Sequence, residues 1–369
     1  MLLCLVAGYF AGKLGISTAK GYSKLSVVLQ AILFIPNFLF VVGVHEAGHA
    51  FAGIWVGFDF RMYVIGPFMW EKEQETWKFK WNTNVNTAGG MVICLPTGTQ
   101  NLVRRFSTFV LGGPVASLIL TVLAWSFYLF FSSVESSNMV VIETVTLLFQ
   151  VVAFLSFVIF IVTALPFHMG GFYTDGARTI RLLGGGEKAR FEFLMLKVMM
   201  ASTSGIRPKR LNMADLLESR KLAERLNEPF GVYILNYLHQ VAFDLGNIEK
   251  AEEHLLQYIN EADQIPEGMR NSVWVDVAFF YAYGKTYLQE AEKYWNLFKP
   301  SAIIPKSQIL ATEAAIAFLK NENELALAKI EVSQKENPNM MDKGVALALH
   351  EKLETLKFKI ENYEQEINS

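Results

Sequence analysis

Residues 25–49 read LSVVLQAILFIPNFLFVVGVHEAGH and decide the fold of the N-terminal half of the chain. Residues 25–44 carry no charge. A helix needs roughly 20 apolar residues to cross about 30 Å of hydrocarbon, so this run is long enough to span a membrane. The apolar character continues past His45 and Glu46. We therefore predict a membrane span near residues 25–57 that carries ionisable groups within it.

Two further runs, 106–134 and 144–174, contain no Asp, Glu, Lys or Arg. Each is long enough for a transmembrane helix, and three such runs in one chain argue against buried helices of a soluble core. We predict spans near both. Residues 1–12, MLLCLVAGYFAG, form a shorter apolar stretch that lacks the basic start of a signal peptide. We interpret this stretch as a fourth, short or re-entrant membrane segment.

The composition agrees with a polytopic membrane protein that carries a soluble appendage. Of the 369 residues 52% are hydrophobic and only 18% are charged, whereas soluble domains contain about 25% charged residues. The net charge of −2 excludes a basic nucleic-acid-binding domain. Two cysteines, Cys4 and Cys94, are too few for a disulfide scaffold or a thiolate zinc cluster.

The loops predict the orientation. Residues 135–143 hold two glutamates and no Lys or Arg, whereas Arg104 and Arg105 precede the second run and basic residues follow residue 174. Basic loops stay on the cytoplasmic side of a membrane. We therefore expect a multi-pass membrane protein, in the cell membrane if the source is bacterial, with its C-terminal third in the cytoplasm.

Residues 58–103 break the helical pattern. Residues 77–81 read WKFKW, an alternation of aromatic and basic side chains that is typical of a strand. Residues 89–95 read GGMVICL and indicate another strand. The sequence predicts a small β segment here. The full fold class is mainly α, with a membrane helical core, this β segment and a soluble helical domain.

Residues 202–208, STSGIRP, are the natural linker to that soluble domain, so we place the domains at 1–204 and 205–369. Three pairs of alanines nine residues apart follow the linker: Ala242 with Ala251, Ala282 with Ala291, and Ala317 with Ala326. Small residues at this spacing let antiparallel helices pack closely, and the pattern resembles tetratricopeptide repeats. Such arrays bind partners, so we expect a cytoplasmic protein partner on the repeats.

The sharpest chemical signal is His45-Glu46-Ala47-Gly48-His49. Residues four apart share one helix face, so both imidazoles can bind one metal ion while Glu46 acts on water beside it. With six histidines and 35 acidic residues, chance would produce this pattern in at most about one chain in a hundred. Ionisable groups at membrane depth cost about 3 kcal/mol each and are functional by default. The motif predicts a zinc site.

A catalytic zinc ion needs a third protein ligand and one open position. His239, His254 and His350 lie in the predicted soluble helices, where a histidine is ordinary. The stretch 165–176, LPFHMGGFYTDG, offers two candidates at the end of the last apolar run, His168 and Asp175. Both side chains are zinc ligands by chemistry, so the residues alone leave both open.

These motifs together resemble the site-2 protease family of intramembrane zinc metalloproteases. The resemblance covers residues 25–185 and rests on HEAGH, on Gly112-Gly113-Pro114, and on Pro166 followed by Asp175-Gly176. It implies that His45, His49 and Asp175 bind zinc and that Glu46 is the catalytic base. Two departures stand out. The family usually has an asparagine shortly before the proline, where this chain has Thr163 and Ala164, and here nine positions separate the proline from the aspartate.

The resemblance implies an intramembrane endopeptidase that cleaves membrane-spanning or membrane-associated peptides. Such a substrate helix must unwind before attack, and the strands of 58–103 offer backbone with which it can pair. Two alternatives stay open. One is a membrane-anchored zinc protease that acts on soluble peptides. The other is an inactive, protease-like scaffold whose helical repeats bind a partner. All three interpretations require the lipid bilayer, and none involves nucleic acid.

Overall fold

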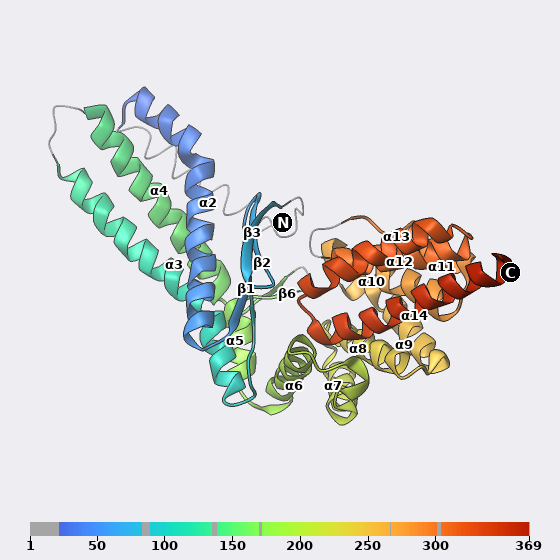
Figure 1. Ribbon diagram of the computed structural model, residues 1–369. Helices are drawn as coiled ribbons and strands as arrows, with labels where there is room; N and C mark the ends of the chain where they lie inside the picture. The colour runs from blue at the N-terminus through green and yellow to red at the C-terminus, as the bar shows by residue number, and fades with distance from the viewer. Residues whose placement is uncertain are drawn as a thin grey trace.

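The structure is a computed structural model that describes residues 22–82, 89–134, 139–169, 172–265, 267–300 and 304–368. The predicted segment at residues 1–12 lies outside these residues. Three long apolar helices form the N-terminal half: α2 (Lys24–Trp55), α3 (Leu102–Ser132) and α4 (Met139–Ala164). With 26 to 32 residues each, they are about 39 to 48 Å long and exceed the thickness of a bilayer's hydrocarbon core. The protein is a membrane protein, and the predicted mainly-α fold with three long apolar helices is confirmed (Figure 1).

Large apolar side chains on the three helices remain uncovered by the rest of the fold. On α2, Ile32 is 68%, Phe51 73% and Trp55 84% exposed. Helices of a soluble protein bury such side chains, whereas helices in a bilayer turn them toward lipid. The small buried cluster among these helices includes Val41, Ala124 and Val152. It holds α2, α3 and α4 together.

The helices α2 and α3 cross with their backbones in contact. A Cβ atom on Gly48 would lie 2.3 Å from the carbonyl oxygen of Gly112, and a Cβ on Gly112 would lie 2.3 Å from that of Gly48. Only glycine allows so close a crossing, which is the usual function of small residues between membrane helices. The crossing brings α3 against the His45–His49 segment.

The helix α4 ends at Ala164, ten residues before the uncharged run ends. Pro166 follows closely, and proline disfavours helical geometry in the residue before it. The next residues form a short hairpin, β5 (His168–Met169) with β6 (Phe172–Tyr173), and then helix α5 (Asp175–Leu183). The absence of charge alone therefore overestimates the length of the third helix.

The predicted β segment is confirmed as a four-stranded antiparallel sheet in the order β3-β2-β1-β4. Its strands are β1 (Asp59–Ile65), β2 (Phe68–Glu73), β3 (Thr76–Trp81) and β4 (Met91–Leu95). A bulge between Phe60 and Met62 shifts the register of β1 against β4. In Figure 1 the sheet lies between the three-helix bundle and the C-terminal helices.

The two faces of the sheet have different neighbours. On one face Tyr63 donates its hydroxyl proton to the carbonyl oxygen of Gly43 on α2, at 2.5 Å. On the other face Met62, Val64 and Met69 are buried, and Met341 from the C-terminal part of the chain packs against them. The sheet therefore connects α2, the helix that carries His45 and His49, to the C-terminal part of the chain.

The remainder of the described chain is helical. Its elements are α6 (Gly186–Thr203), η2 (Pro208–Arg210), α7 (Met213–Leu226), α8 (Gly231–Asp244), α9 (Ile248–Asn260), η3 (Ala262–Gln264), α10 (Glu267–Phe279), η4 (Phe280–Gly284), α11 (Leu288–Trp295), α12 (Lys306–Leu319), α13 (Asn323–Glu336), η5 (Asn337–Asn339) and α14 (Lys343–Asn368). The six alanines of the nine-residue pairs are all buried in one apolar core. The resemblance of these helices to tetratricopeptide repeats stays a prediction.

Candidate metal centre

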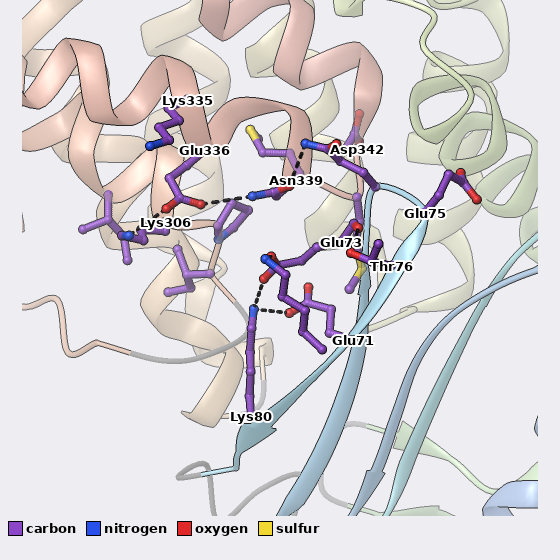
Figure 2. Close-up of a pocket in the computed structure, with 17 residues that line it drawn as sticks. Glu71, Glu73, Glu75, Thr76, Lys80, Lys306, Lys335, Glu336, Asn339 and Asp342 are labelled. Atoms are coloured by element: carbon purple, nitrogen blue, oxygen red, sulfur yellow. Dashed lines mark hydrogen bonds and ion pairs between the residues drawn. The ribbon is translucent and has the colours of Figure 1, made fainter.

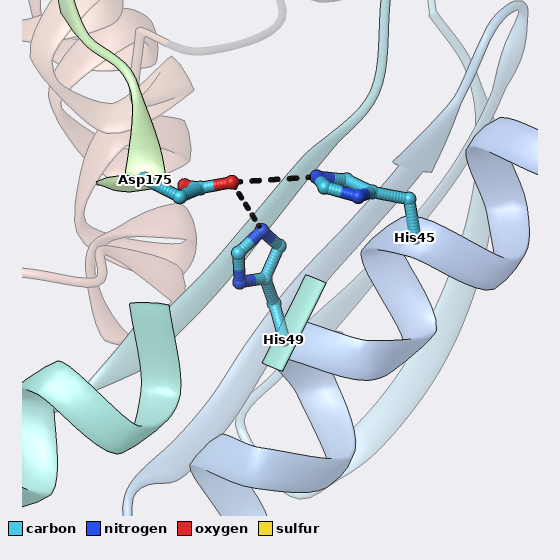
Figure 3. Close-up of side chains that lie close together, drawn as sticks. All are labelled: His45, His49 and Asp175. Carbon is cyan, nitrogen blue, oxygen red and sulfur yellow. Dashed lines mark ion pairs between the residues drawn. The ribbon is translucent and has the colours of Figure 1, made fainter. Parts of the chain in front are cut away.

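The helix α2 places His45 and His49 one turn apart on the same face, as their spacing predicts (Figure 3). Their rings meet edge to face with centroids 4.9 Å apart. Both histidines and the neighbouring Glu46 are buried, with 6%, 8% and 8% of their surface exposed. Three ionisable groups buried at membrane depth indicate a functional site, because each is costly there without a partner.

Asp175 approaches both histidines from a different part of the chain. Its Oδ2 lies 3.5 Å from Nε2 of His45 and 3.5 Å from Nε2 of His49 (Figure 3). One ligand atom from each of the three side chains falls within 4.8 Å of the others. Because Asp175 is the first residue of α5, the start of that helix determines whether this set is complete.

The start of α5 is held tightly. The Oγ1 of Thr174 caps the helix by accepting a hydrogen bond from the backbone N–H of Ala177 at 3.3 Å. A Cβ atom on Gly176 would lie 1.8 Å from the carbonyl oxygen of Ala164, so only glycine lets α5 begin against the end of α4. Gly176 therefore allows the carboxylate of the neighbouring Asp175 to lie close to the two histidines.

The helix α3 orients both imidazoles. His45 Nδ1 lies 2.9 Å from the hydroxyl oxygen of Ser117, and His49 Nδ1 lies 3.0 Å from the carbonyl oxygen of Phe109. With Nδ1 occupied in this way, Nε2 of each ring is left facing Asp175. Partners of this kind fix the direction of metal-binding histidines. Ser117 and Phe109 could not be predicted as partners of the histidines, because neither lies in a motif.

Gly113 completes the contact between α3 and the site. A Cβ atom there would lie 2.3 Å from Nε2 of His49 and 2.7 Å from Cε1 of His45. Any larger residue would occupy the space in front of the imidazole nitrogens. The Gly112-Gly113-Pro114 motif thus has two physical uses, a close helix crossing and room for the histidine rings.

The three side chains fit a zinc ion of the catalytic kind. Two imidazole nitrogens and one carboxylate oxygen are a known ligand set for catalytic zinc, which keeps its fourth position for water or substrate. Burial would raise the pKa of the Asp175 carboxyl, but hydrogen bonds to His45 and His49 outweigh it and hold the pKa at about 2. The carboxylate is therefore ionised at neutral pH, as metal binding requires.

His168, the alternative third ligand, is not part of this group. It lies on β5 with an exposed side chain, and its ring packs against Tyr173 at a centroid distance of 4.8 Å. The hairpin therefore places the His168 ring against Tyr173 and not beside His45 and His49. Of the two candidates that the sequence left open, the structure brings Asp175 to the histidine pair.

Comparison with known proteins agrees with this geometry. Residues 33–206 match the model of peptidase family M50, the family of site-2 proteases. This part of the chain is similar to peptidase family M50. The match contains His45, Glu46, His49 and Asp175, and it confirms the resemblance that the motifs indicated. No curated protein and no solved structure matches the chain significantly.

A cavity lies away from the M50 motif, between the β2–β3 hairpin and the C-terminal helices (Figure 2). Its volume is about 1010 Å³. Its charged side chains largely neutralise one another: Lys80 pairs with Glu71 at 2.6 Å, and Lys306 pairs with Glu336 at 2.7 Å. Neither histidine nor cysteine is among the described residues that line it. The described lining therefore offers no imidazole or thiolate ligand to a metal ion.

Proposed function

We propose that the protein is an intramembrane zinc metalloendopeptidase that cleaves membrane-spanning or membrane-associated peptides. One observation carries the proposal: Asp175 meets His45 and His49 beside Glu46, and these last three residues lie on α2, an apolar helix long enough to cross a membrane. A soluble protease has no physical reason to bury these groups at membrane depth. The match of residues 33–206 to family M50 supports the same reaction class.

The chain's own residues supply the acid–base chemistry. His45, His49 and Asp175 would hold a zinc ion, which would supply Lewis acidity to lower the pKa of water and to polarise the scissile carbonyl. Glu46 takes the proton of the attacking water as its oxygen bonds to the carbonyl carbon. It then delivers that proton to the amide nitrogen as the C–N bond breaks. The Nδ1 contacts with Ser117 and Phe109 keep both imidazoles in place during these steps.

The strand β4 is the proposed docking edge for the unwound substrate. It is the last strand in the order β3-β2-β1-β4, so within the described chain its outer edge carries no partner strand. Gly90 precedes β4 and lies against Glu46. An extended peptide that adds to this edge satisfies its own backbone groups and passes the catalytic carboxylate.

The charged residues near the helix ends indicate how the protein is oriented in the membrane. Arg104 and Arg105 in the first turn of α3, and the basic residues that follow residue 174, favour the cytoplasmic side for those ends. We propose a multi-pass protein with the helices after residue 205 in the cytoplasm, where they bind a protein partner. In a bacterial source the membrane would be the cell membrane.

Metal analysis of the detergent-purified protein tests the proposal. We expect about one zinc ion per wild-type chain, its loss in Asp175→Ala, and its retention in His168→Ala. Loss in His168→Ala alone would reassign the third ligand. A wild type that holds no zinc after resupply would favour the inactive scaffold, because no metal would be available to activate water.

Cleavage assays separate the two enzymatic alternatives, with Glu46→Gln as the blank. Cleavage that requires a transmembrane segment in the substrate supports intramembrane proteolysis. Equal cleavage of a soluble peptide of the same sequence would instead support a membrane-anchored protease of soluble substrates. Zinc binding without cleavage of either substrate by the wild type would contradict both.

A further inference from the structure

A buried cluster of charges joins α5, the helix that begins with Asp175, to the helical part of the chain. At its centre is Glu228, in the turn between α7 and α8, with a side chain only 2% exposed. Its Oε1 accepts a hydrogen bond from Arg181 Nη2 at 2.7 Å, and its Oε2 accepts one from the Tyr173 hydroxyl at 2.7 Å. Arg181 lies on α5 and Tyr173 lies two residues before Asp175. One carboxylate thus contacts the chain on both sides of the metal ligand.

The cluster is balanced in charge and closely packed. Glu192 of α6 accepts a hydrogen bond from Arg181 Nε at 3.1 Å, and Arg178 Nε lies 3.7 Å from its other oxygen. The Arg181 guanidinium also lies 4.1 Å from the centroid of the Tyr173 ring. Two arginines thus face two buried glutamates. Removing one partner from such a set leaves an uncompensated buried charge, which is strongly unfavourable.

Glu228 comes from a well-fixed turn. Asn227 ends α7 in the left-handed conformation, with φ 52°. The backbone N–H of Glu228 then donates to the carbonyl oxygen of Ala223 at 2.9 Å, and Pro229 follows. The turn therefore presents the carboxylate in one direction, toward α5.

The helix α5 depends on such outside contacts. It has nine residues, and isolated helices shorter than about 12 residues are marginal. The ligand at its first residue must nevertheless be placed within about 0.5 Å for a metal site to bind tightly. Contacts with Ala164 fix one end of α5, and the Glu228 cluster fixes the rest.

We infer that Glu228 is a positioning residue for the zinc ligand Asp175, so that the helical part of the chain completes the metal site. The inference rests on the proposed function. Glu228 lies beyond residues 33–206, which match family M50, so this contact extends past the peptidase core. Whatever moves the turn between α7 and α8 would move α5, and with it the affinity of the site for zinc.

Zinc affinity of the full-length protein in detergent, measured by competition with a chromogenic chelator, tests the inference. We expect Glu228→Gln to weaken zinc binding about 10- to 100-fold, the usual effect of losing a group that orients a metal ligand. Glu261→Gln is the matched control. It removes a carboxylate that binds Arg220 at 2.6 and 3.0 Å without contact to α5, and should change affinity less than about twofold.

A double variant tests whether the effect passes through Arg181. Because Glu228 and Arg181 act as a pair, Glu228→Gln combined with Arg181→Met should weaken zinc binding no more than about as much as Glu228→Gln alone. A loss equal to the product of the two single effects would contradict the pathway. Tyr173→Phe, which deletes one hydroxyl only, supplies a milder variant if the charge variants fail to fold, and it should still weaken binding measurably.

Hydrogen exchange on the metal-free proteins gives a readout that needs no zinc. In Glu228→Gln we expect faster exchange confined to α5, with the core of α10 and α12 unchanged. Unchanged exchange in α5, or faster exchange everywhere, would overturn the inference. If the wild type binds zinc and the two glutamine variants bind it with equal affinity, the inference would also be wrong, but the proposed function would stand. A wild type without zinc would instead refute the proposed function.

Discussion

Gly90 lies directly against the carboxylate of Glu46. A Cβ atom on Gly90 would come within 2.5 Å of Glu46 Oε1, and the backbone of Gly90 has a φ of +106°, which other residues rarely adopt. The loop that leads into β4 can therefore reach the proposed catalytic base only because this residue is glycine. The contact therefore links the residues at the start of β4 to the proposed catalytic base.

Replacing Gly90 with alanine should impair catalysis while sparing the metal. The methyl group would push the Glu46 carboxylate away from the attacking water, and a displacement of about 1 Å can cost about 100-fold in rate. We expect Gly90→Ala to lower the cleavage rate about 10- to 100-fold with zinc content unchanged. Gly89→Ala is the control, because nothing lies within 4 Å of a Cβ at that position. Equal rates in the two variants would contradict the role of this contact.

Ser117 is expected to support zinc binding through His45. Ser117→Ala removes the hydroxyl that lies 2.9 Å from His45 Nδ1, so the ring loses the contact that fixes its direction. Zinc affinity should fall about 10- to 100-fold, as found for such supporting groups. Ser126→Ala serves as control, since the Ser126 hydroxyl donates only to the Val122 carbonyl of its own helix, at 2.8 Å. Chelator competition measures both, and equal affinities would refute the prediction.

Proline variants of β4 test substrate docking on its open edge. The backbone N–H groups of neighbouring strand residues point to opposite edges of the strand. One of the two variants, Val92→Pro or Ile93→Pro, therefore removes a hydrogen-bond donor from the outer edge of β4. That variant should lose cleavage of a transmembrane substrate yet keep zinc, because neither residue belongs to the metal group. Hydrogen exchange identifies which variant keeps the β1–β4 ladder. Full cleavage by that variant would reject docking on β4.

Asp276 should make the stability of the helical part depend on pH. Burial raises the pKa of this carboxyl on α10 from 3.8 to about 7, although Gln308 and Asn236 hydrogen-bond to it and lower it. The folded state therefore holds this proton more tightly than the unfolded state does. Stability should fall as the pH rises from about 4 through about 7.

Asp276→Asn should weaken that dependence, because an amide does not titrate. Melting of the full chain in detergent at about pH 5 and about pH 8 measures it, and the difference between the two melting temperatures should shrink by a few degrees in the variant. Other titrating groups are common to both proteins and cancel in the comparison. An unchanged difference would show that Asp276 does not carry the effect.

Local patterns along the chain were enough to predict a membrane protein with a metal-binding motif. Uncharged runs located α2, α3 and α4, since a bilayer demands about 20 apolar residues per helix. The alternation in residues 77–81 identified β3. The spacing of His45 and His49 was enough to put both on one face, because helical periodicity is local.

Features that depend on contacts between distant segments could be seen only in the folded chain. The choice of Asp175 over His168 follows from where α5 begins, and that depends on Gly176 packing against Ala164. Likewise, Ser117 meets His45 only because α2 and α3 cross at two glycines, and Glu228 meets Arg181 only because α7 turns back toward α5. Local periodicity reveals which groups share a face of one element. Packing between elements, which no local pattern encodes, decides which faces meet.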